Sequence, residues 1–187
     1  MRVVAGICRG MRLMAPTGKT TRPTSDRVKE ALFSIISSRF SLDGASVLDI
    51  CAGTGALGVE ALSRGAASCL FIENDRSALV TLEKNISDPR IKNRAEIAAM
   101  DVIKALSLCA RRGKRFDVVF FDPPYNSDLY LPVLDALASP GIMALNSLFV
   151  AECPTKKTLP DTFGQLARFA RRIYGDTVLD FFILEGT

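Results

Sequence analysis

The sequence of 187 residues predicts a doubly wound α/β fold, in which helices cover both faces of a mostly parallel sheet. The first observation is that short apolar runs, typical of buried strands, alternate along the chain with segments of helical periodicity. The second is that the strand-like runs end in turns rich in glycine or proline. The third lies near the C-terminus, where two strand-like segments follow one another around Tyr174-Gly175-Asp176 and predict an antiparallel hairpin.

The predicted elements alternate through residues 41–187, which we expect to form the core of a single domain. Strands are expected at residues 47–50, 69–72, 95–99, 117–121, 147–153, 166–173 and 177–184. Helices are expected at residues 56–64, 76–86, 101–112 and 129–138. Strict alternation implies a parallel sheet covered on both faces, to which the terminal hairpin adds an antiparallel member.

Residues 1–40 are expected to form an N-terminal extension of this core. Residues 3–5 and 11–14 predict a short β-hairpin, and residues 16–23 predict a loop. Thr24 or Ser25 can then cap a helix. The apolar residues that follow have the spacing of an amphipathic helix packed against something larger, and they are Val28, Ala31, Leu32, Ile35 and Ile36.

The extension is also the basic part of the chain. The first forty residues carry eight lysines and arginines against two acidic residues, whereas the whole chain has a net charge of only +4. A basic arm on a slightly acidic body indicates contact with phosphates, although a solvated charged surface explains the same pattern. Within the arm, Arg2, Arg9 and Arg12 are the candidate contacts to a nucleic acid.

Composition argues against several other classes of protein. No run of residues approaches the roughly 18 apolar residues that a membrane span needs, and the N-terminal residues lack the apolar core of a signal peptide. Histidine is absent, and no two of the five cysteines form a CxxC pair, so the usual zinc sites are not predicted. We therefore expect a cytoplasmic protein with no bound metal and no membrane contact, and we expect a monomer.

A glycine-rich turn follows the first strand of the core, in the segment from Val47 to Gly58. Small residues there let the backbone approach a ligand closely, and the next helix offers free N–H groups. The glycines form a GxGxxG, which also occurs in NAD-binding proteins. The DxxAGxG form of the segment, however, resembles the first motif of Rossmann-like methyltransferases. The candidate cofactor-binding residues are Asp49, Ala52, Gly53 and Gly55.

Two further acidic residues follow strands and are candidates for adenosine binding. Glu73 directly follows the second strand, where a carboxylate can accept both ribose hydroxyls of either NAD or S-adenosylmethionine. Asp101 follows the third strand, where this class of methyltransferase often places an acceptor for the adenine amino group. Asp101 can equally be the N-cap of the helix that follows, and the two roles do not exclude each other.

The segment Asp122-Pro123-Pro124-Tyr125 ends the fourth strand and carries the predicted chemistry. The amino nitrogen of a nucleobase is a poor nucleophile because its lone pair is delocalised into the ring. The carboxylate of Asp122 and a backbone carbonyl, expected to be that of Pro123, can bind its two hydrogens and direct the lone pair toward a methyl donor. The two prolines stiffen the loop and lack N–H donors, and Tyr125 is placed to stack on an extruded base. Asp122 therefore belongs to both the catalytic and the cofactor-binding sets.

Nearly end to end, the chain resembles the bacterial 16S rRNA guanine-N2 methyltransferase family. The matching segments are Val4–Gly6 with Arg9-Gly10, Arg22–Val28 with Glu30–Phe33, the glycine motif with Leu62–Gly65, and Asp122–Tyr125. The second of these, RPTxDRVxE, is much more specific than the general methyltransferase motifs. The resemblance implies a Rossmann-like class I methyltransferase fold with seven strands, S-adenosylmethionine as methyl donor, and guanine N2 in 16S rRNA of the small ribosomal subunit as acceptor.

The same resemblance implies that Arg22, Thr24 and Arg27 lie near the cofactor-binding face or the RNA. For the two arginines the physical reason is pairing with phosphate or carboxylate, although Arg27 can instead form a salt bridge within its helix.

Other functions share parts of this pattern. Adenine-N6 and cytosine-N4 nucleic-acid methyltransferases, and protein-glutamine methyltransferases, use a similar loop, although the glutamine enzymes favour Asn at the position of Asp122. A non-catalytic RNA-binding module is a rival of a different class. An NAD-dependent oxidoreductase is a third, but it would leave the loop at Asp122 unexplained. Guanine is favoured over adenine only by the family resemblance.

Overall fold

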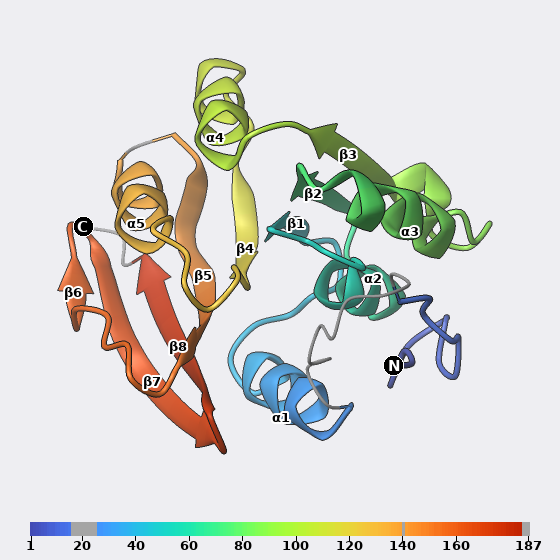
Figure 1. Cartoon of the computed structure of the whole chain (residues 1–187), viewed down its shortest axis with the longest axis horizontal. Coiled ribbons are helices and arrows are strands. Elements are labelled where there is room, and N and C mark those ends of the chain that lie inside the picture. Colours follow the sequence, from blue (N-terminus) through green and yellow to red (C-terminus); the bar gives the residue numbers. More distant parts are fainter. Residues whose placement is uncertain (16–25, 140, 185–187) are drawn as a thin grey trace.

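The computed structural model describes residues 1–15, 26–139 and 141–184, and it contains an eight-stranded mixed sheet. The order of the strands across the sheet is β3-β2-β1-β4-β5-β8-β7-β6 (Figure 1). Their bounds are β1 Ser46–Ile50, β2 Ser68–Glu73, β3 Ala95–Ala99, β4 Phe116–Phe121, β5 Met143–Pro154, β6 Thr162–Phe163, β7 Leu166–Tyr174 and β8 Thr177–Leu184. The first five strands pair in parallel, and β8, β7 and β6 pair antiparallel, which confirms the predicted fold class.

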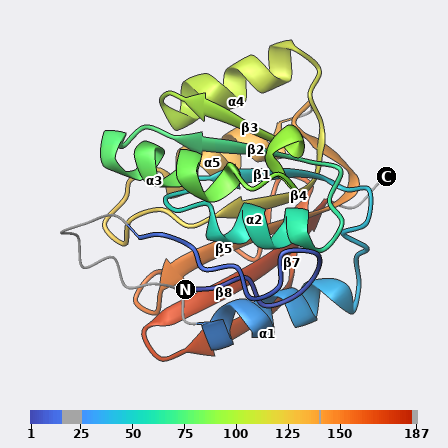
Figure 2. The ribbon, with the colours of Figure 1, turned by 90° about the vertical axis from the view of Figure 1, so that its right-hand side faces the viewer.

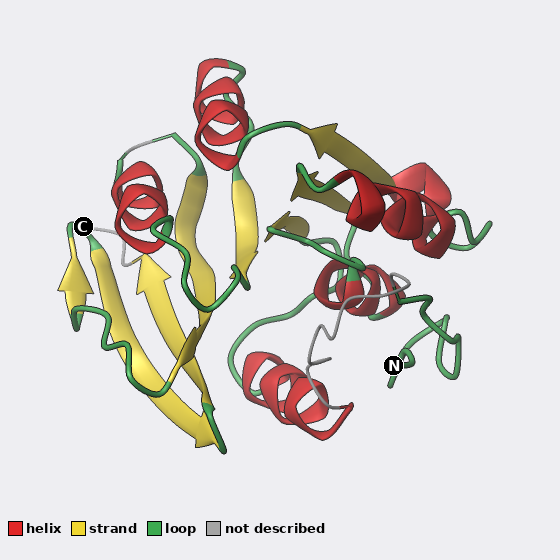
Figure 3. Cartoon of the chain, viewed as in Figure 1, coloured by secondary structure: helices red, strands yellow, loops and turns green. Residues whose placement is uncertain are grey.

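Five α-helices lie on the two faces of this sheet (Figure 2, Figure 3). Their bounds are α1 Asp26–Ser37, α2 Ala56–Ser63, α3 Arg76–Ile86, α4 Val102–Arg111 and α5 Tyr130–Ala138, and a short 3-10 helix spans Lys92–Arg94. One apolar core lies between the sheet and α1, α2, α3 and the N-terminal residues. A second core lies between the sheet and α4 and α5. Each layer of helices thus buries one face of the strands, as the alternation of elements predicted.

The sheet differs from the prediction at one edge. Seven strands were expected, and the structure adds β6, which pairs with β7 through Thr162↔Ala167 and Phe163↔Leu166. A strand of two residues is too short to produce an alternating pattern in the sequence, so no local signal could predict it.

The N-terminal β-hairpin was also predicted, and the structure confirms it in part. Residues 1–15 fold back antiparallel, with one bridge between Arg2 and Arg12 and a backbone hydrogen bond from Val3 N to Met11 O at 2.9 Å. The pairing does not extend into regular strands, because other backbone N–H groups of this segment are bound by side chains of α2. Glu60 accepts from Val4 N and Ala5 N at 2.8 and 3.0 Å, and Ser63 Oγ accepts from Cys8 N at 2.9 Å.

A buried ionic network joins this N-terminal segment and α1 to α2. Glu60 is fully buried and pairs with Lys29 of α1 at 3.3 Å and with Arg64 at 2.9 Å. Lys29 Nζ also donates to the carbonyl oxygen of Arg2 at 2.6 Å. Leu32 and Ile36 are buried as the helical spacing predicted, while the N-cap predicted at residues 24–25 lies outside the described part of the chain.

The strand order reverses its direction at the centre of the sheet. From β1 the chain proceeds to β2 and β3 on one side, and β4 and β5 follow on the other side. The loops after β1 and β4 therefore diverge at the carboxyl ends of two adjacent strands, which is the topological switch point where α/β proteins bind ligands. The two segments that carried the predicted chemistry, at residues 51–55 and 122–125, both lie at this point.

Candidate active site

The glycine turn after β1 leaves space at one position and is tightly packed at two others. Gly53 has φ of +55°, and a Cβ built on it would meet nothing nearer than the carbonyl oxygen of Cys51 at 4.0 Å. A Cβ on Gly55 would instead lie 2.5 Å from Leu82, and one on Gly58 would lie 2.3 Å from Phe71. Gly53 therefore opens the turn toward a ligand, whereas Gly55 and Gly58 let α2 pack against β2 and α3.

Asp49 lies beneath this turn and is almost fully buried, at 2% exposure. Its Oδ2 accepts a hydrogen bond from Gly58 N at 2.9 Å, which fixes the first turn of α2 over the end of β1. Burial raises the pKa of Asp49 to about 7, and the nearby Glu73 adds to the rise, while the bond from Gly58 opposes it. Asp49 thus organises the turn from below and contributes a negative charge to the site only above this pKa.

Glu73 links the glycine turn to the end of β2. Its Oε2 accepts from Gly53 N at 2.8 Å, and its Oε1 accepts from Asn74 N and Asp75 N, each at 2.8 Å. A carboxylate has about four lone-pair positions, so three backbone donors leave room for one more partner. Glu73 therefore holds the backbone of the two loops together by hydrogen bonds even when no ligand is bound.

Asp101 is exposed and is the N-cap of α4, because its Oδ1 accepts from Lys104 N at 3.1 Å. The capping alternative drawn from the sequence is confirmed. Capping uses one oxygen, and the other stays available to a ligand at the carboxyl end of β3.

Asp122 follows β4 immediately and lies beside the glycine turn. The pairing of Ile50 with Phe121 brings the next residues, Cys51 and Asp122, together at the sheet edge. Asp122 is half-buried, and within the described part of the chain its carboxylate accepts no hydrogen bond. Burial raises the pKa of Asp122 above its ordinary value, and the charges of Glu152 and Asp49 raise it further. The carboxylate is thus a desolvated acceptor to which no described residue donates.

The backbone carbonyl of Pro123 shares this property. No donor in the described residues reaches it, whereas the next carbonyl, that of Pro124, accepts from Ser127 N at 2.9 Å. Pro123 is buried, while Pro124 and Tyr125 are exposed. The loop therefore offers two adjacent oxygen acceptors, and each proline removes an N–H group that would otherwise compete for them.

Tyr125 extends from this loop with 39% of its surface exposed, and its hydroxyl lies 2.7 Å from Thr177 Oγ1. Thr177 begins β8, so the sequence reasoning, which treated the C-terminal hairpin only as a sheet edge, missed it. Glu152 was also missed, although a carboxylate inside the apolar strand β5 is a signal that could have been followed. It is buried, and its charge raises the pKa of Asp122 more than the charge of Asp49 does.

A third missed residue, Asn85 of α3, connects the N-terminal segment to the glycine turn. Its amide accepts from Met14 N at 2.8 Å and donates to Met14 O at 3.1 Å and to Thr54 O at 2.9 Å. An asparagine on a helix face carries no signal of such a role. Its effect is to fix residue 14 beside the turn that the sequence associated with the cofactor.

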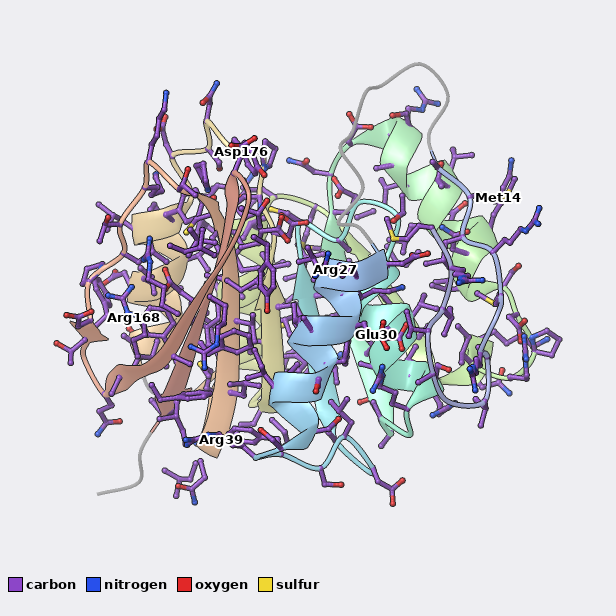
Figure 4. The ribbon with its side chains drawn as sticks, turned by 90° about the horizontal axis from the view of Figure 1, so that it is seen from below. Met14, Arg27, Glu30, Arg39, Arg168 and Asp176 are labelled. Carbon is purple, nitrogen blue, oxygen red and sulfur yellow. The ribbon has the colours of Figure 1, made fainter. Side chains whose placement is uncertain are left out.

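The predicted RNA-binding residues are spread over the N-terminal segment and α1. Arg9, Arg12 and Arg27 are exposed, and their guanidinium groups have no partner among the described residues. Arg2 is exposed too but pairs with Asp26 at 3.6 Å. In Figure 4, Arg27 lies toward the same end of the molecule as Met14 and Asp176, and Arg39 lies at the other end of α1. Arg22 and Thr24 lie outside the described residues.

Two other classes of site are absent from the described ranges. No group of three or more His, Cys, Asp or Glu side chains there could hold a metal ion. No helix in those ranges is long and apolar enough to cross a membrane.

Comparison with known proteins assigns the chain to a family. Residues 1–183 match the family model described as Conserved hypothetical protein 95. The chain belongs to this family. The ribosomal RNA small subunit methyltransferase D of Escherichia coli K12 is 35% identical over 160 residues, which are 86% of this chain and 78% of that protein. The family resemblance drawn from the sequence is thereby confirmed.

Solved structures agree with this assignment to the Conserved hypothetical protein 95 family. The yhhF protein of Escherichia coli superposes with a TM-score of 0.86 at 30% identity, covering 100% of this chain and 99% of that one. An RNA methyltransferase from Salinibacter ruber, solved in complex with S-adenosyl-L-homocysteine, superposes with a TM-score of 0.61 at 15% identity. That alignment covers 88% of this chain and 95% of the other, and it shows a shared fold, that of class I methyltransferases.

Proposed function

We propose that this protein transfers a methyl group from S-adenosylmethionine to the exocyclic N2 amino group of a guanine in 16S rRNA. The observation that carries the proposal is the pair of acceptors after β4, namely the Asp122 carboxylate and the Pro123 carbonyl. Neither receives a hydrogen bond from the described residues, and both lie beside the open glycine turn. The rRNA substrate, which would place the protein in the cytoplasm, is supported by the names of its relatives. The choice of guanine N2 rests on the family resemblance.

The cofactor fits the loops after β1, β2 and β3. The space at Gly53 would admit a ligand against the backbone of Ala52 and Gly53, and the acidic groups of Asp49 and Glu73 suit a cationic ligand. Glu73 has one lone-pair position left for a ribose hydroxyl, and Asp101 has one oxygen left for an adenine amino group. When bound, S-adenosylmethionine supplies an electrophilic methyl group on a positively charged sulfur.

The loop after β4 would activate the amino group. Asp122 Oδ and the Pro123 carbonyl oxygen accept its two hydrogens, which favours a pyramidal nitrogen whose lone pair points away from the loop. Asp122, whose pKa is raised by burial, is suited to take up the proton that the nitrogen loses on methylation. Tyr125 stacks on the extruded base. Positioning and prearranged acceptors suffice for this chemistry, so the proposed reaction needs no metal.

The RNA would be bound through arginines whose guanidinium groups have no partner among the described residues. Arg9, Arg12 and Arg27 are available to phosphates, and Arg2 would have to leave Asp26 or share it. Because these groups are few, binding to RNA alone should be weak and sensitive to salt, which favours a ribosomal particle as the substrate. Arg22 and Thr24 belong to the same proposed surface by family resemblance, and the protein is proposed to act as a monomer.

The test is transfer of labelled methyl from S-adenosylmethionine to unmodified small ribosomal subunits, naked 16S rRNA and duplex DNA, followed by nucleoside analysis. Label in N2-methylguanosine of the ribosomal substrates is expected. Label in methyladenine or methylcytosine would retain the mechanism and overturn the base. No label in any nucleic acid, with S-adenosylhomocysteine bound, would overturn the proposal in favour of a protein acceptor or a binding-only role.

A further inference from the structure

The hydroxyl of Tyr125 makes a hydrogen bond to one other side chain of the described residues. Thr177 Oγ1 lies 2.7 Å from it, and the two residues are 52 positions apart in the sequence. Tyr125 stands on an exposed loop, whereas Thr177 is buried at 9% exposure. An exposed aromatic ring is therefore held by its polar end against a fixed point of the sheet.

Thr177 is fixed because, as the first residue of β8, it lies between two neighbouring strands of the sheet. It pairs with Pro154 at the end of β5 and with Tyr174 at the end of β7. The adjacent turn is tied down by the hydrogen bond from Thr155 N to Asp176 O at 3.0 Å, and the next residue, Val178, is fully buried. Figure 4 shows Asp176 at the tip of this hairpin. The position of Thr177 is thus set by the sheet and not by the loop after β4 that carries Tyr125.

We propose that Thr177 is a positioning residue that holds the ring of Tyr125 in the orientation in which it stacks on the base to be methylated. The inference rests on the proposed function, because it takes Tyr125 as the stacking group. It extends that function from the loop after β4 to the C-terminal hairpin, which becomes one wall of the site for the acceptor base.

The physical effect is a reduced entropic cost of stacking. A tyrosine on a loop has two side-chain torsions that must be ordered when a base stacks on it, and immobilising such a side chain typically weakens binding about twofold to tenfold. The hydrogen bond to Thr177 orders the ring before the base arrives. The two prolines before Tyr125 stiffen the backbone in the same way, so both ends of the residue are restrained.

The experiment compares three variants on the ribosomal substrate with saturating S-adenosylmethionine. Thr177→Val replaces the hydroxyl with a methyl group of similar size, and Tyr125→Phe removes the partner hydroxyl while keeping the ring. Each is expected to lower kcat/KM for the RNA substrate about fivefold. The double variant is expected to be no worse than either single variant, because each change removes the same contact.

Two measurements separate positioning from a general structural role. The affinity for S-adenosylhomocysteine and the melting temperature should stay close to those of the unmodified protein in both single variants. Tyr174→Phe is the matched control, since it removes a hydroxyl from the same hairpin that makes no hydrogen bond in the described residues, and its kcat/KM should not change. Tyr125→Ala should lose more than Tyr125→Phe, because it also removes the stacking surface.

The inference is overturned if Thr177→Val retains full kcat/KM, or if the losses of the two single variants add in the double variant. It is equally overturned if Thr177→Val loses cofactor affinity and melting temperature together with activity. These outcomes differ from a failure of the proposed function, in which the unmodified protein itself forms no N2-methylguanosine.

Discussion

Glu73 and Asp122 end two strands of one sheet, at the same edge, yet their carboxylates have opposite surroundings. Glu73 accepts three backbone N–H groups, from Gly53, Asn74 and Asp75, each at 2.8 Å. Asp122 accepts no hydrogen bond from the described residues and has a raised pKa. A buried acceptor that is satisfied by backbone donors stabilises the loops around it, whereas one left without donors costs stability until a ligand supplies them.

This contrast separates the two halves of the site. On the side of β1 and β2, the acidic groups are part of the architecture, since Asp49 holds Gly58 and Glu73 holds the glycine turn. On the side of β4, the acceptors of Asp122 and Pro123 receive no hydrogen bond from residues 1–15, 26–139 or 141–184. The first half is therefore expected to govern folding and cofactor affinity, and the second half the reaction itself. Substitutions at the two carboxylates should produce opposite patterns.

Asp122→Ala should give the largest loss of activity. The rate of methyl transfer is expected to fall about 10²- to 10³-fold, because the variant removes an acceptor that acts on the reacting nitrogen. Binding of S-adenosylhomocysteine, measured by calorimetry, should change little. Asp128→Ala, an exposed aspartate of the same loop, is the control and should retain activity. An equal loss of cofactor affinity and rate in Asp122→Ala would contradict the division between the halves.

Glu73→Ala should show the opposite pattern. Three backbone N–H groups lose a charged acceptor, so the free energy of unfolding is expected to fall by about 2–4 kcal/mol. Cofactor affinity should fall with it, because the glycine turn loses its anchor to β2. Denaturant unfolding and calorimetry test both effects, with Glu83→Ala on the exposed face of α3 as the control. A variant with normal stability and only lowered kcat would contradict this expectation.

The sequence predicted the elements of both halves but not the contacts between distant ones. The predicted helix at residues 76–86 and the predicted strands at 95–99 and 177–184 have the observed bounds, because apolar periodicity is a local property. The loop at Asp122 was placed correctly because a buried strand ends there. The bonds of Asn85 to Met14 and of Thr177 to Tyr125 join residues 71 and 52 positions apart, and no local pattern encodes them.

The N-terminal hairpin shows how tertiary packing limits a local pattern. Residues 1–15 contain two short apolar runs around glycines, which normally indicates paired strands. The two runs do pair at Arg2 and Arg12, but Glu60 and Ser63 of α2 bind other backbone donors of the segment. Gly6 allows that approach, because a Cβ on it would lie 1.8 Å from the carbonyl oxygen of Ser63. The backbone donors of this segment are therefore divided between a partner strand and a helix surface.

Asp49→Asn tests how strongly the ionisation of the Asp49 carboxyl group, on the side of β1 and β2, opposes folding. The pKa of Asp49 is raised to about 7 in the folded state, so its ionisation destabilises the fold as the pH rises from about 4, the value for an unfolded aspartate, through 7. The variant should therefore be more stable by about 1–3 kcal/mol at pH 8 and nearly unchanged at pH 4, where the Asp49 carboxyl of the folded protein is neutral, as the asparagine amide is. The asparagine oxygen can still accept from Gly58 N.

Thermal unfolding at the two pH values measures this difference, and Asp135→Asn on the exposed face of α5 is the control. A stabilised Asp49→Asn with weaker cofactor binding would fit a carboxylate retained for function at a cost in stability. A variant that is less stable than the original at pH 8 would contradict this expectation, because it would show that the folded protein stabilises the ionised carboxylate of Asp49.

The smallest effects are expected in the N-terminal arm, where the same contrast between partnered and unpartnered groups applies to cations. Arg12 is exposed with no partner for its guanidinium group in the described residues, whereas Arg2 is paired with Asp26. Arg12→Ala should weaken RNA binding about twofold to fivefold and lower the slope of log affinity against log salt by about one. Arg2→Ala should do less, because Asp26 already offsets the charge of the Arg2 side chain.

Binding isotherms at several salt concentrations distinguish the two variants. Arg112→Ala is the control: this residue lies at the end of α4 on the opposite face of the sheet, so its variant should change neither affinity nor slope. If all three variants behave alike, only the total charge of the protein matters and the arm makes no specific contact. If Arg12 alone matters, groups that have no partner in the described residues are the ones that meet the substrate, as at Asp122.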